Sequence, residues 1–437
     1  MEEHALPEPR TDHADAYEAS DVISNEPARM KTGWIAAFLI LAGLIMRAPI
    51  VVLPLYIEPM SREMGRDPGS FGILTSLPLL MFVLVSLIVP WLADKLNLTR
   101  TLQLGMWLIV VGSLMRLLVT WNTMLVATGL IGAGIAILNI GMPTLVTEVF
   151  SEKPGLYTTS YSTGLVFGSV LLVFIDPLIT AAFGWRAGIW VMAGMALIPA
   201  LISMMMPQIR VAGSGADASP QTGSRTENRS GAKLRFLRDI RTWLFVGMFA
   251  GQAFLSYTLS AWLPVMLGAS HITGVHYTGI MVLFNLAGLP ASLIIPMFLA
   301  RTKRVYHLWF VVWVTLVQAA VVALYPVRPM DALWGPVYWY VFGGVSCFFF
   351  TAIFVMVLTF YPLKAATSAD AADLSGLSQS LGYLIAAAGP LLYGFVYGGQ
   401  HMPGVSFAWG MTLVVLLNAW CAWHVVRINK FGLETLR

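Results

Sequence analysis

Long stretches of apolar residues recur along almost the whole chain, and they restrict its fold more than any other feature of the sequence. Each is about 20 residues long or longer, the length that an α-helix needs to cross a hydrocarbon layer about 30 Å thick. Inside lipid every backbone polar group must be bonded within the protein, which leaves helices or closed barrels. The stretches are continuous rather than alternating, which favours helices. We therefore predict an all-α membrane protein.

Twelve spans are expected, six in each half of the chain, at 33–58, 71–93, 101–120, 122–148, 156–182, 186–206, 242–267, 276–300, 305–325, 334–360, 373–397 and 405–426. An acidic, polar segment precedes them, and a segment rich in Gly, Ser, Arg and Lys separates the halves. The predicted organisation is a disordered acidic cytoplasmic tail over 1–30, an N-terminal six-helix bundle over 31–206, a cytoplasmic linker over 207–241, a C-terminal six-helix bundle over 242–426 and a cytoplasmic tail over 427–437.

The distribution of basic residues predicts the orientation in the membrane. Only 11% of the residues are charged, against roughly 25% in a soluble domain. With both termini placed inside, twenty of the 26 Lys and Arg residues fall in inside segments and five in outside segments or adjoining span ends. Positive charge stays inside. We expect a multi-pass protein of the plasma membrane with both termini cytoplasmic.

Motifs of catalysis are absent from the sequence. There is no Gly-Lys-Ser/Thr phosphate loop and no His-Glu-x-x-His pair. The seven histidines are scattered over tails, loops and span ends, and both cysteines, Cys347 and Cys421, fall inside apolar stretches. We predict no catalytic residue, no enzymatic activity, no cofactor, no metal and no nucleic-acid partner; the lipid bilayer and a small molecule are the expected partners.

Arg47 is the sharpest single signal. It lies 14 residues into the first span, about 21 Å along a helix that rises about 1.5 Å per residue. An unpaired cation near the bilayer centre costs about 2.5–3.5 kcal/mol even on lenient scales. Arg47 must therefore face a polar cavity, where its guanidinium offers paired donors to an anion, or a buried ion-pair partner that holds helices together.

The acidic residues of the spans lie nearer their ends. Glu58 ends the first span, Glu148 ends the fourth, and Asp176 is 20 residues into the fifth. Each is either a hydrated helix-end residue or a member of a proton relay, and we expect the hydrated helix end. With Arg47 the only charge deep in a span, the cavity should be electropositive, which favours an anion or a neutral solute with partial negative charge.

Two sets of motifs resemble known families. The halves echo each other, as in Arg47–Pro54 and Tyr257–Pro264, and residues 90–100 (Pro-Trp-Leu-Ala-Asp-Lys-Leu-Asn-Leu-Thr-Arg) are similar to the loop signature of the major facilitator superfamily, with Pro90 and Asn97 where glycines are usual. Further motifs are Leu44–Pro49 with Pro54-Leu55, Gly134–Ala136 with Asn139 and Pro143, Gly184–Arg186, Gly251-Gln252 with Tyr257 and Ala261–Pro264, Phe284-Asn285 with Gly288–Pro290, and Leu374–Gly376 with Gln379, Gly382-Tyr383 and Gly389-Pro390. These resemble the branch of that superfamily that contains cyanate permeases and 2-nitroimidazole transporters.

The resemblance implies the superfamily fold: twelve transmembrane helices in two pseudo-symmetric six-helix bundles with a solute site between them. It also implies a conformational latch of Asp94, Lys95 and Arg100 in the turn after the second span. Uncharged residues on the spans where the resemblance is densest are candidates to join Arg47 in binding the substrate, or to bond helices together: Asn139, Gln252, Tyr257, Asn285, Gln379 and Tyr383. The aromatic Trp91 and Trp262 are expected at membrane interfaces.

The predicted function is secondary active transport of a small solute, in particular a small anion, by alternating access. Protons are a candidate coupling ion. The alternative within this class is export of neutral aromatic or drug-like compounds, and a multidrug cation exporter is disfavoured because such a pocket needs a buried carboxylate. A membrane solute receptor or a membrane enzyme is a more distant alternative, because the sequence contains neither a signalling domain nor a visible nucleophile and base.

Overall fold

The computed structural model describes residues 33–86, 88–150, 154–209, 236–327, 333–397 and 405–432. Within these ranges the chain is almost entirely helical, with one isolated bridge between Ala365 and Phe431 and no strand. The predicted acidic tail over 1–30 and most of the predicted linker lie outside the described residues.

The first half of the chain forms the N-terminal bundle. Residues 33–46 are helical, and the elements that follow are α2 (Ala48–Val52), η1 (Leu53–Tyr56), α3 (Ile57–Met64), η2 (Pro68–Phe71), α4 (Gly72–Ser86), α5 (Val89–Leu96), α6 (Leu98–Met115), η3 (Arg116–Leu118), α7 (Trp121–Val149), α8 (Pro154–Phe183) and α9 (Trp185–Met205).

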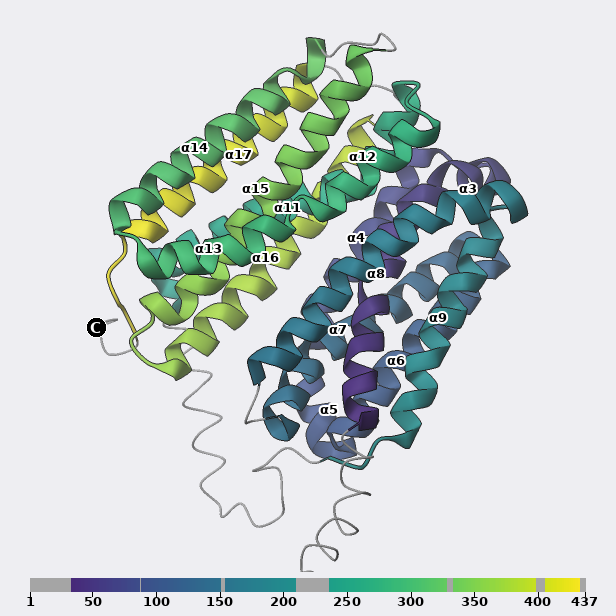
Figure 1. Ribbon diagram of the computed structural model, residues 1–437, viewed down its shortest axis with the longest axis horizontal. Coiled ribbons are helices and arrows are strands. Elements are labelled where there is room, and N and C mark those ends of the chain that lie inside the picture. Colours follow the sequence, from purple (N-terminus) through teal and green to yellow (C-terminus); the bar gives the residue numbers. More distant parts are fainter. Residues whose placement is uncertain are drawn as a thin grey trace, which may run out of the picture.

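The second half forms the C-terminal bundle. Its elements are α11 (Ile240–Ala269), α12 (Gly274–Leu286), α13 (Leu289–Arg301), α14 (Arg304–Ala323), η4 (Tyr325–Val327), α15 (Trp334–Lys364), α16 (Ser368–Tyr397) and α17 (Val405–Arg427). Figure 1 shows the two halves as separate bundles of long helices, purple to teal and green to yellow.

Twelve helical spans in the described residues are long and apolar enough to cross a membrane, which confirms the predicted fold class. Some spans are interrupted where proline removes a backbone donor. The predicted second span, 71–93, contains a break between α4 and α5, with Pro90 in the first turn of α5. The predicted eighth span, 276–300, is divided between α12 and α13 in the same way, with Pro290 in the first turn of α13.

The first span is broken where Arg47 lies. The helix of 33–46 ends at Met46, Arg47 forms a bend, and α2 begins at Ala48 with Pro49 in its first turn. A second proline, Pro54, is the second residue of the 3-10 turn η1. Because neither proline can donate a backbone hydrogen bond, the middle of this span is built from short segments, and the Arg47 side chain projects from the first break.

The two bundles meet along one side of the molecule. There α4 and η2 pack against α16, α8 against α12, and η1 against α11. Backbones approach closely at two glycines: a Cβ at Gly72 would lie 2.6 Å from the Pro390 carbonyl oxygen, and one at Gly394 would collide with the carbonyl of Gly69. Trp262, expected at a membrane interface, is instead fully buried at this contact and donates to the Pro390 carbonyl at 3.1 Å.

On the opposite side the bundles diverge. Figure 1 shows them separating towards the end of the molecule that holds α5 and the last turn of α17, and the space-filling view shows the purple to teal and the green to yellow bodies as distinct masses. The side on which α8 and α12 meet is called the closed side below, and the side of α5 the open side.

Candidate solute-binding site

A cavity of about 230 Å³ lies between the two bundles. Its walls come from both halves: the first span, α4, α7 and α8 of the N-terminal bundle, and α11, α15 and α16 of the C-terminal bundle. Five of the seven residues that the sequence singled out for substrate binding line it, namely Arg47, Asn139, Gln252, Tyr257 and Tyr383. The structure therefore brings together, from four spans, polar side chains that lie far apart in the sequence.

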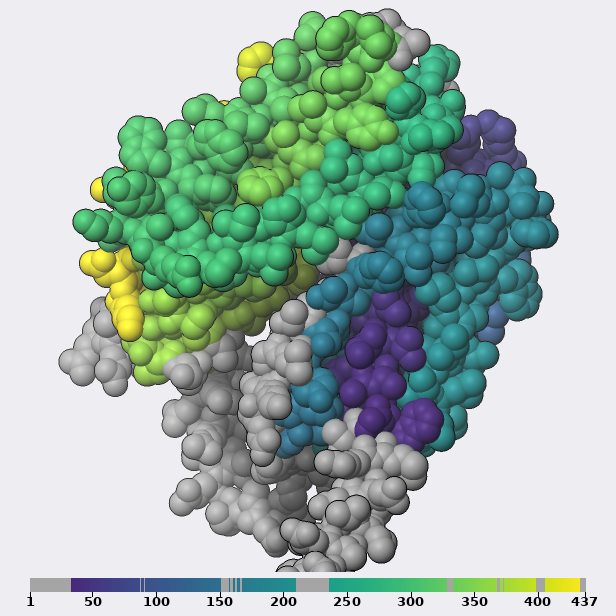
Figure 2. Space-filling view, in the orientation of Figure 1, coloured from purple at the N-terminus to yellow at the C-terminus, as the bar shows by residue number. Residues whose placement is uncertain are grey.

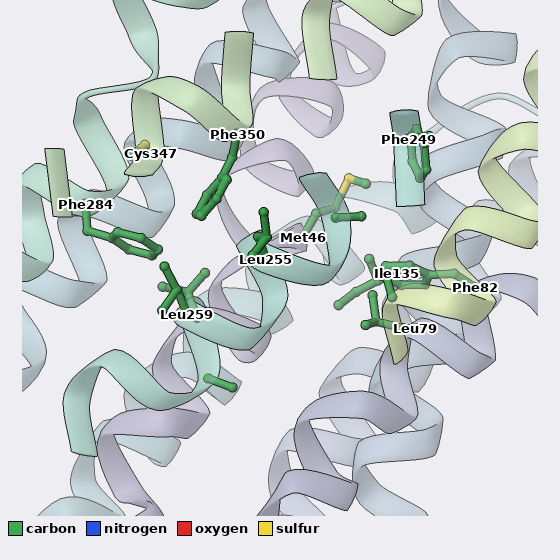
Figure 3. Close-up of a cluster of buried hydrophobic side chains, with 14 of the residues drawn as sticks. Met46, Leu79, Phe82, Ile135, Phe249, Leu255, Leu259, Phe284, Cys347 and Phe350 are labelled. Atoms are coloured by element: carbon green, nitrogen blue, oxygen red, sulfur yellow. The ribbon is translucent and has the colours of Figure 1, made fainter. Parts of the chain in front are cut away.

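Apolar side chains complete the cavity wall. Met46, Phe82, Ile135 and Phe350 line the cavity and belong to the buried apolar core. Figure 3 shows these four side chains among their neighbours on both bundles. A pocket that is mostly apolar with a few placed polar groups is typical of small-molecule sites.

Arg47 faces this cavity as an exposed side chain. In the described part of the chain no carboxylate lies within ion-pair distance of its guanidinium, since the three ion pairs found there are Arg62–Glu58, Arg186–Glu63 and Arg241–Asp239. The buried ion pair that the sequence left open as an alternative is therefore not formed in this conformation. The hydrogen-bond donors of the Arg47 guanidinium remain available to a solute in the cavity.

Two tyrosines form part of the cavity wall on the C-terminal bundle. Tyr383 on α16 packs edge to face against Tyr257 on α11, with ring centroids 6.2 Å apart, and against Phe249, at 5.0 Å. Across the bundle contact it also packs against Phe82 of α4, at 5.5 Å. Tyr383 thus lies where the site and the contact between bundles coincide.

Two predicted site residues lie outside the cavity wall. The Asn285 side chain donates to the Met281 carbonyl in its own helix, at 2.9 Å, next to the α12–α13 break. Gln379 donates to the Ser375 hydroxyl one turn earlier on α16, at 2.7 Å. Each amide satisfies part of its hydrogen bonding locally, so their role in binding stays a prediction.

The predicted latch residues are all exposed. Asp94 and Lys95 end α5, and Arg100 is in the first turn of α6. Between them, Asn97 has a positive φ of 74° and caps α6 through a hydrogen bond from the Arg100 amide to its side chain, at 2.9 Å. With a ψ of 163°, Asn97 adopts a backbone conformation that strongly favours glycine, which gives a physical reason why the superfamily favours glycine here and means that asparagine stands there under backbone strain.

Two buried charged groups of the N-terminal bundle were not identified from the sequence. Arg116, 1% exposed, donates to the Pro49 carbonyl at 3.0 Å and to the Thr128 hydroxyl at 3.3 Å, so it holds the broken first span against α7. Asp176 was expected to be hydrated, which is wrong: it is 3% exposed and accepts a hydrogen bond from the Tyr56 hydroxyl. Glu58 and Glu148 are exposed helix-end residues, as expected.

The position of Asp176 explains the error. Helix α8 continues to Phe183, seven residues beyond Asp176, so the carboxylate lies about two turns inside the helix end. The signal that could have found it is a tyrosine at matching depth on the first span.

Among the described residues, no group of three or more His, Cys, Asp and Glu side chains could hold a metal ion.

A twelve-span, two-bundle protein with a polar cavity between its halves belongs to the class of solute transporters that bind at a bundle interface. The family model of the Major Facilitator Superfamily matches residues 33–390, and the chain belongs to that superfamily. It is a membrane transporter rather than an enzyme.

Three bacterial relatives place it in the branch that the motifs indicated. The uncharacterized transporter YycB of Bacillus subtilis (strain 168) is 30% identical over 400 residues, covering 90% of this chain and 92% of the relative. The 2-nitroimidazole transporter of Escherichia coli (strain K12) is 28% identical, covering 80% and 84%, and the cyanate transport protein CynX of the same organism is 25% identical, covering 82% and 88%. The crystal structure of a D-xylose–proton symporter has the same fold, with a TM-score of 0.72, 10% identity and coverage of 92% and 99%.

Proposed function

We propose that this transporter is a secondary active carrier of a small anion, which binds in the cavity at Arg47 and crosses the membrane by alternating access. The observation that carries the proposal is an arginine in mid-span that faces the cavity between the bundles with no carboxylate in ion-pair distance among the described residues. A guanidinium forms charge-assisted, paired hydrogen bonds with planar anions. The relative named cyanate transport protein supports an anion.

The remaining polar residues of the cavity complete the proposed site. Asn139 and Gln252 offer amide groups from opposite bundles, and Tyr257 and Tyr383 offer hydroxyls. Because the contributions come from both bundles, rocking of one bundle against the other would expose the site first on one side and then on the other. Asn285 and Gln379 would join the site only if their local hydrogen bonds were exchanged.

The charged residues of the open side indicate how the protein is oriented in the membrane. The open side contains the exposed Asp94, Lys95 and Arg100 of the proposed latch. Basic residues are in excess on the open side, so this side faces the cytoplasm. Both termini then lie inside the cell, and the protein resides in the plasma membrane. The conformation is then open inward, and the latch would engage when the bundles close there.

A neutral aromatic substrate is the second candidate. The cavity carries the aromatic side chains Phe82, Phe350 and Phe354 in addition to the two tyrosines, and one relative is named 2-nitroimidazole transporter. Flat ring systems stack well on such walls. In this case Arg47 would bind a nitro group or another partly negative substituent rather than a full charge.

An uptake assay with anionic, neutral and cationic solutes distinguishes an anionic from a neutral aromatic substrate. The purified protein is reconstituted in liposomes and tested with labelled cyanate, nitrate and acetate, with labelled 2-nitroimidazole, and with the lipophilic cation tetraphenylphosphonium. We expect uptake of at least one anion above that of protein-free liposomes, with no uptake of the cation. Uptake of 2-nitroimidazole alone would favour the second candidate, and uptake of the cation alone would contradict both.

A further inference from the structure

Asp176 is a buried carboxyl group without a basic partner. It lies on α8, is 3% exposed, and has no Lys, Arg or His within ion-pair distance among the described residues. The Tyr56 hydroxyl of η1 donates to its Oδ1, and the Thr180 hydroxyl donates to Oδ2 at 3.4 Å. Arg116, the buried base of this bundle, donates instead to Pro49 and Thr128.

The other elements packed on α8 bring no cation to it. These are the helix of residues 33–46, which contains no titratable group, and α2, α7, α9 and α12. On α7 the only charged group is Glu148, at the far end of the helix, and on α9 it is Arg186, which is paired with Glu63. On α12 the titratable groups are Tyr277, which interacts electrostatically with both Asp176 and Glu58, and His276, whose ring packs against Tyr340.

The neighbours of Asp176 leave it little room for water. The Tyr56 hydroxyl and the Asp176 Oδ1 both lie against Gly188 of α9, where even a Cβ atom would collide with them. The Tyr56 ring also packs against Trp185, with centroids 6.0 Å apart. A side chain at position 188 would displace the tyrosine from the carboxyl group, so this hydrogen bond depends on a glycine in α9.

Asp176 is placed where the bundles touch. Its helix packs against α12, and the η1 segment that carries Tyr56 packs against α11, so both partners of the hydrogen bond belong to the closed side. Tyr56 also belongs to the same broken span as Arg47. When the bundles separate on this side, α8 loses its contact with α12 and Tyr277, and water gains access to Asp176 from that face.

We propose that Asp176 is a proton-binding site, occupied while the closed side is sealed and emptied to the outer solution when that side opens. The inference rests on the alternating access proposed above. The step is a simple exchange with the outer solution: while the closed side is open, a hydronium ion gives one proton to the Asp176 carboxylate and leaves as water, and sealing follows. When that side opens again, the carboxylic acid can return the proton to water as hydronium. Because burial in an apolar environment disfavours the charged form of a carboxyl group, protonation stabilises the sealed state and deprotonation favours its opening.

Spin-label distance measurements without any solute test the inference directly. The full-length protein, with both native cysteines replaced by alanine, receives labels at Arg62→Cys on α3 and at Thr273→Cys before α12; both positions are exposed on the closed side. We expect the distance distribution to shift with pH, with the short distance of the sealed state dominant at low pH. Asp176→Asn, a neutral isostere, should hold the sealed state at all pH values.

The matched control is Glu63→Gln, which removes an exposed carboxylate on the same side and should leave the pH dependence unchanged. A wild-type distribution independent of pH, or a pH dependence that persists unaltered in Asp176→Asn, would overturn the inference. Because no solute is present, either outcome is independent of whether the carrier transports an anion.

Infrared spectroscopy of the wild-type chain covers the case in which Asp176→Asn fails to fold. With carboxyl-¹³C aspartate incorporated, a buried protonated aspartic acid gives a carbonyl band that moves on labelling. We expect such a band in the solute-free protein at acidic pH, also in an Asp370→Asn background that removes the other aspartate buried in the described residues. Its absence would exclude a protonated Asp176.

Discussion

Uptake of the small anion is expected to fall at least about tenfold when Arg47 is replaced by alanine. A hydrogen bond to a charged group contributes about 1.5–3 kcal/mol, and each 1.4 kcal/mol corresponds to about a tenfold change in affinity. The guanidinium faces the cavity without a carboxylate partner in the described part of the chain, so its removal leaves no partner charge stranded. The loss should therefore appear in transport and not in stability.

Two variants make this result specific. Arg47→Lys keeps the charge but loses the paired donors, and it should retain part of the uptake. Arg62→Ala removes an exposed arginine whose ion pair with Glu58 is on the surface, and its uptake should equal that of the wild type. Full anion uptake in a folded Arg47→Ala protein would show that Arg47 does not bind the anion.

Gly168→Val should strongly destabilise the N-terminal bundle. A Cβ at Gly168 of α8 would overlap the Leu44 carbonyl of the first span, and at Gly43 it would lie 2.6 Å from the Tyr161 carbonyl oxygen. Overpacking typically costs about 1–3 kcal/mol and sometimes more, and here the obstacle is backbone rather than a flexible side chain. We expect strongly reduced yield of monodisperse protein and a lower midpoint of thermal unfolding in detergent.

Gly194→Val is the matched control, because Gly194 is also within a helix, on α9, and a Cβ there has no neighbour within 4 Å. It should fold and unfold like the wild type. If both valine variants behave alike, close packing of the first span on α8 is not what limits stability at Gly168.

The sequence was sufficient for the number of spans, because membrane thickness sets the length of each apolar stretch. It was sufficient for the family because motifs on several spans carry the resemblance. It also identified Arg47, since a lone charge at mid-span stands out against apolar neighbours. Which of the polar candidates line the cavity was harder to predict. Asn285 and Gln379 resemble Asn139 and Gln252 in the sequence, but their amides donate within their own helices, which no single-sequence pattern distinguishes.

The remaining errors concern pairs that form between distant segments. Asp176 is buried because Tyr56 reaches it from a span 120 residues earlier, and Trp262 is buried because it donates to Pro390 on α16. Position along a helix predicts depth in the membrane, but burial depends on which neighbour covers the side chain. The second charge buried in the N-terminal bundle, Arg116, was missed for the same reason: its acceptors, Pro49 and Thr128, lie on other helices.

Equilibrium binding tests the central claim, that Arg47 binds a small anion in the cavity between the bundles. The labelled anion that gives the highest uptake is titrated onto purified wild-type and Arg47→Ala protein in detergent, with thermal unfolding measured on the same samples. We predict saturable binding to the wild type and an affinity at least about tenfold lower in the variant, with equal stability. Equal affinity in two equally stable proteins would contradict the account.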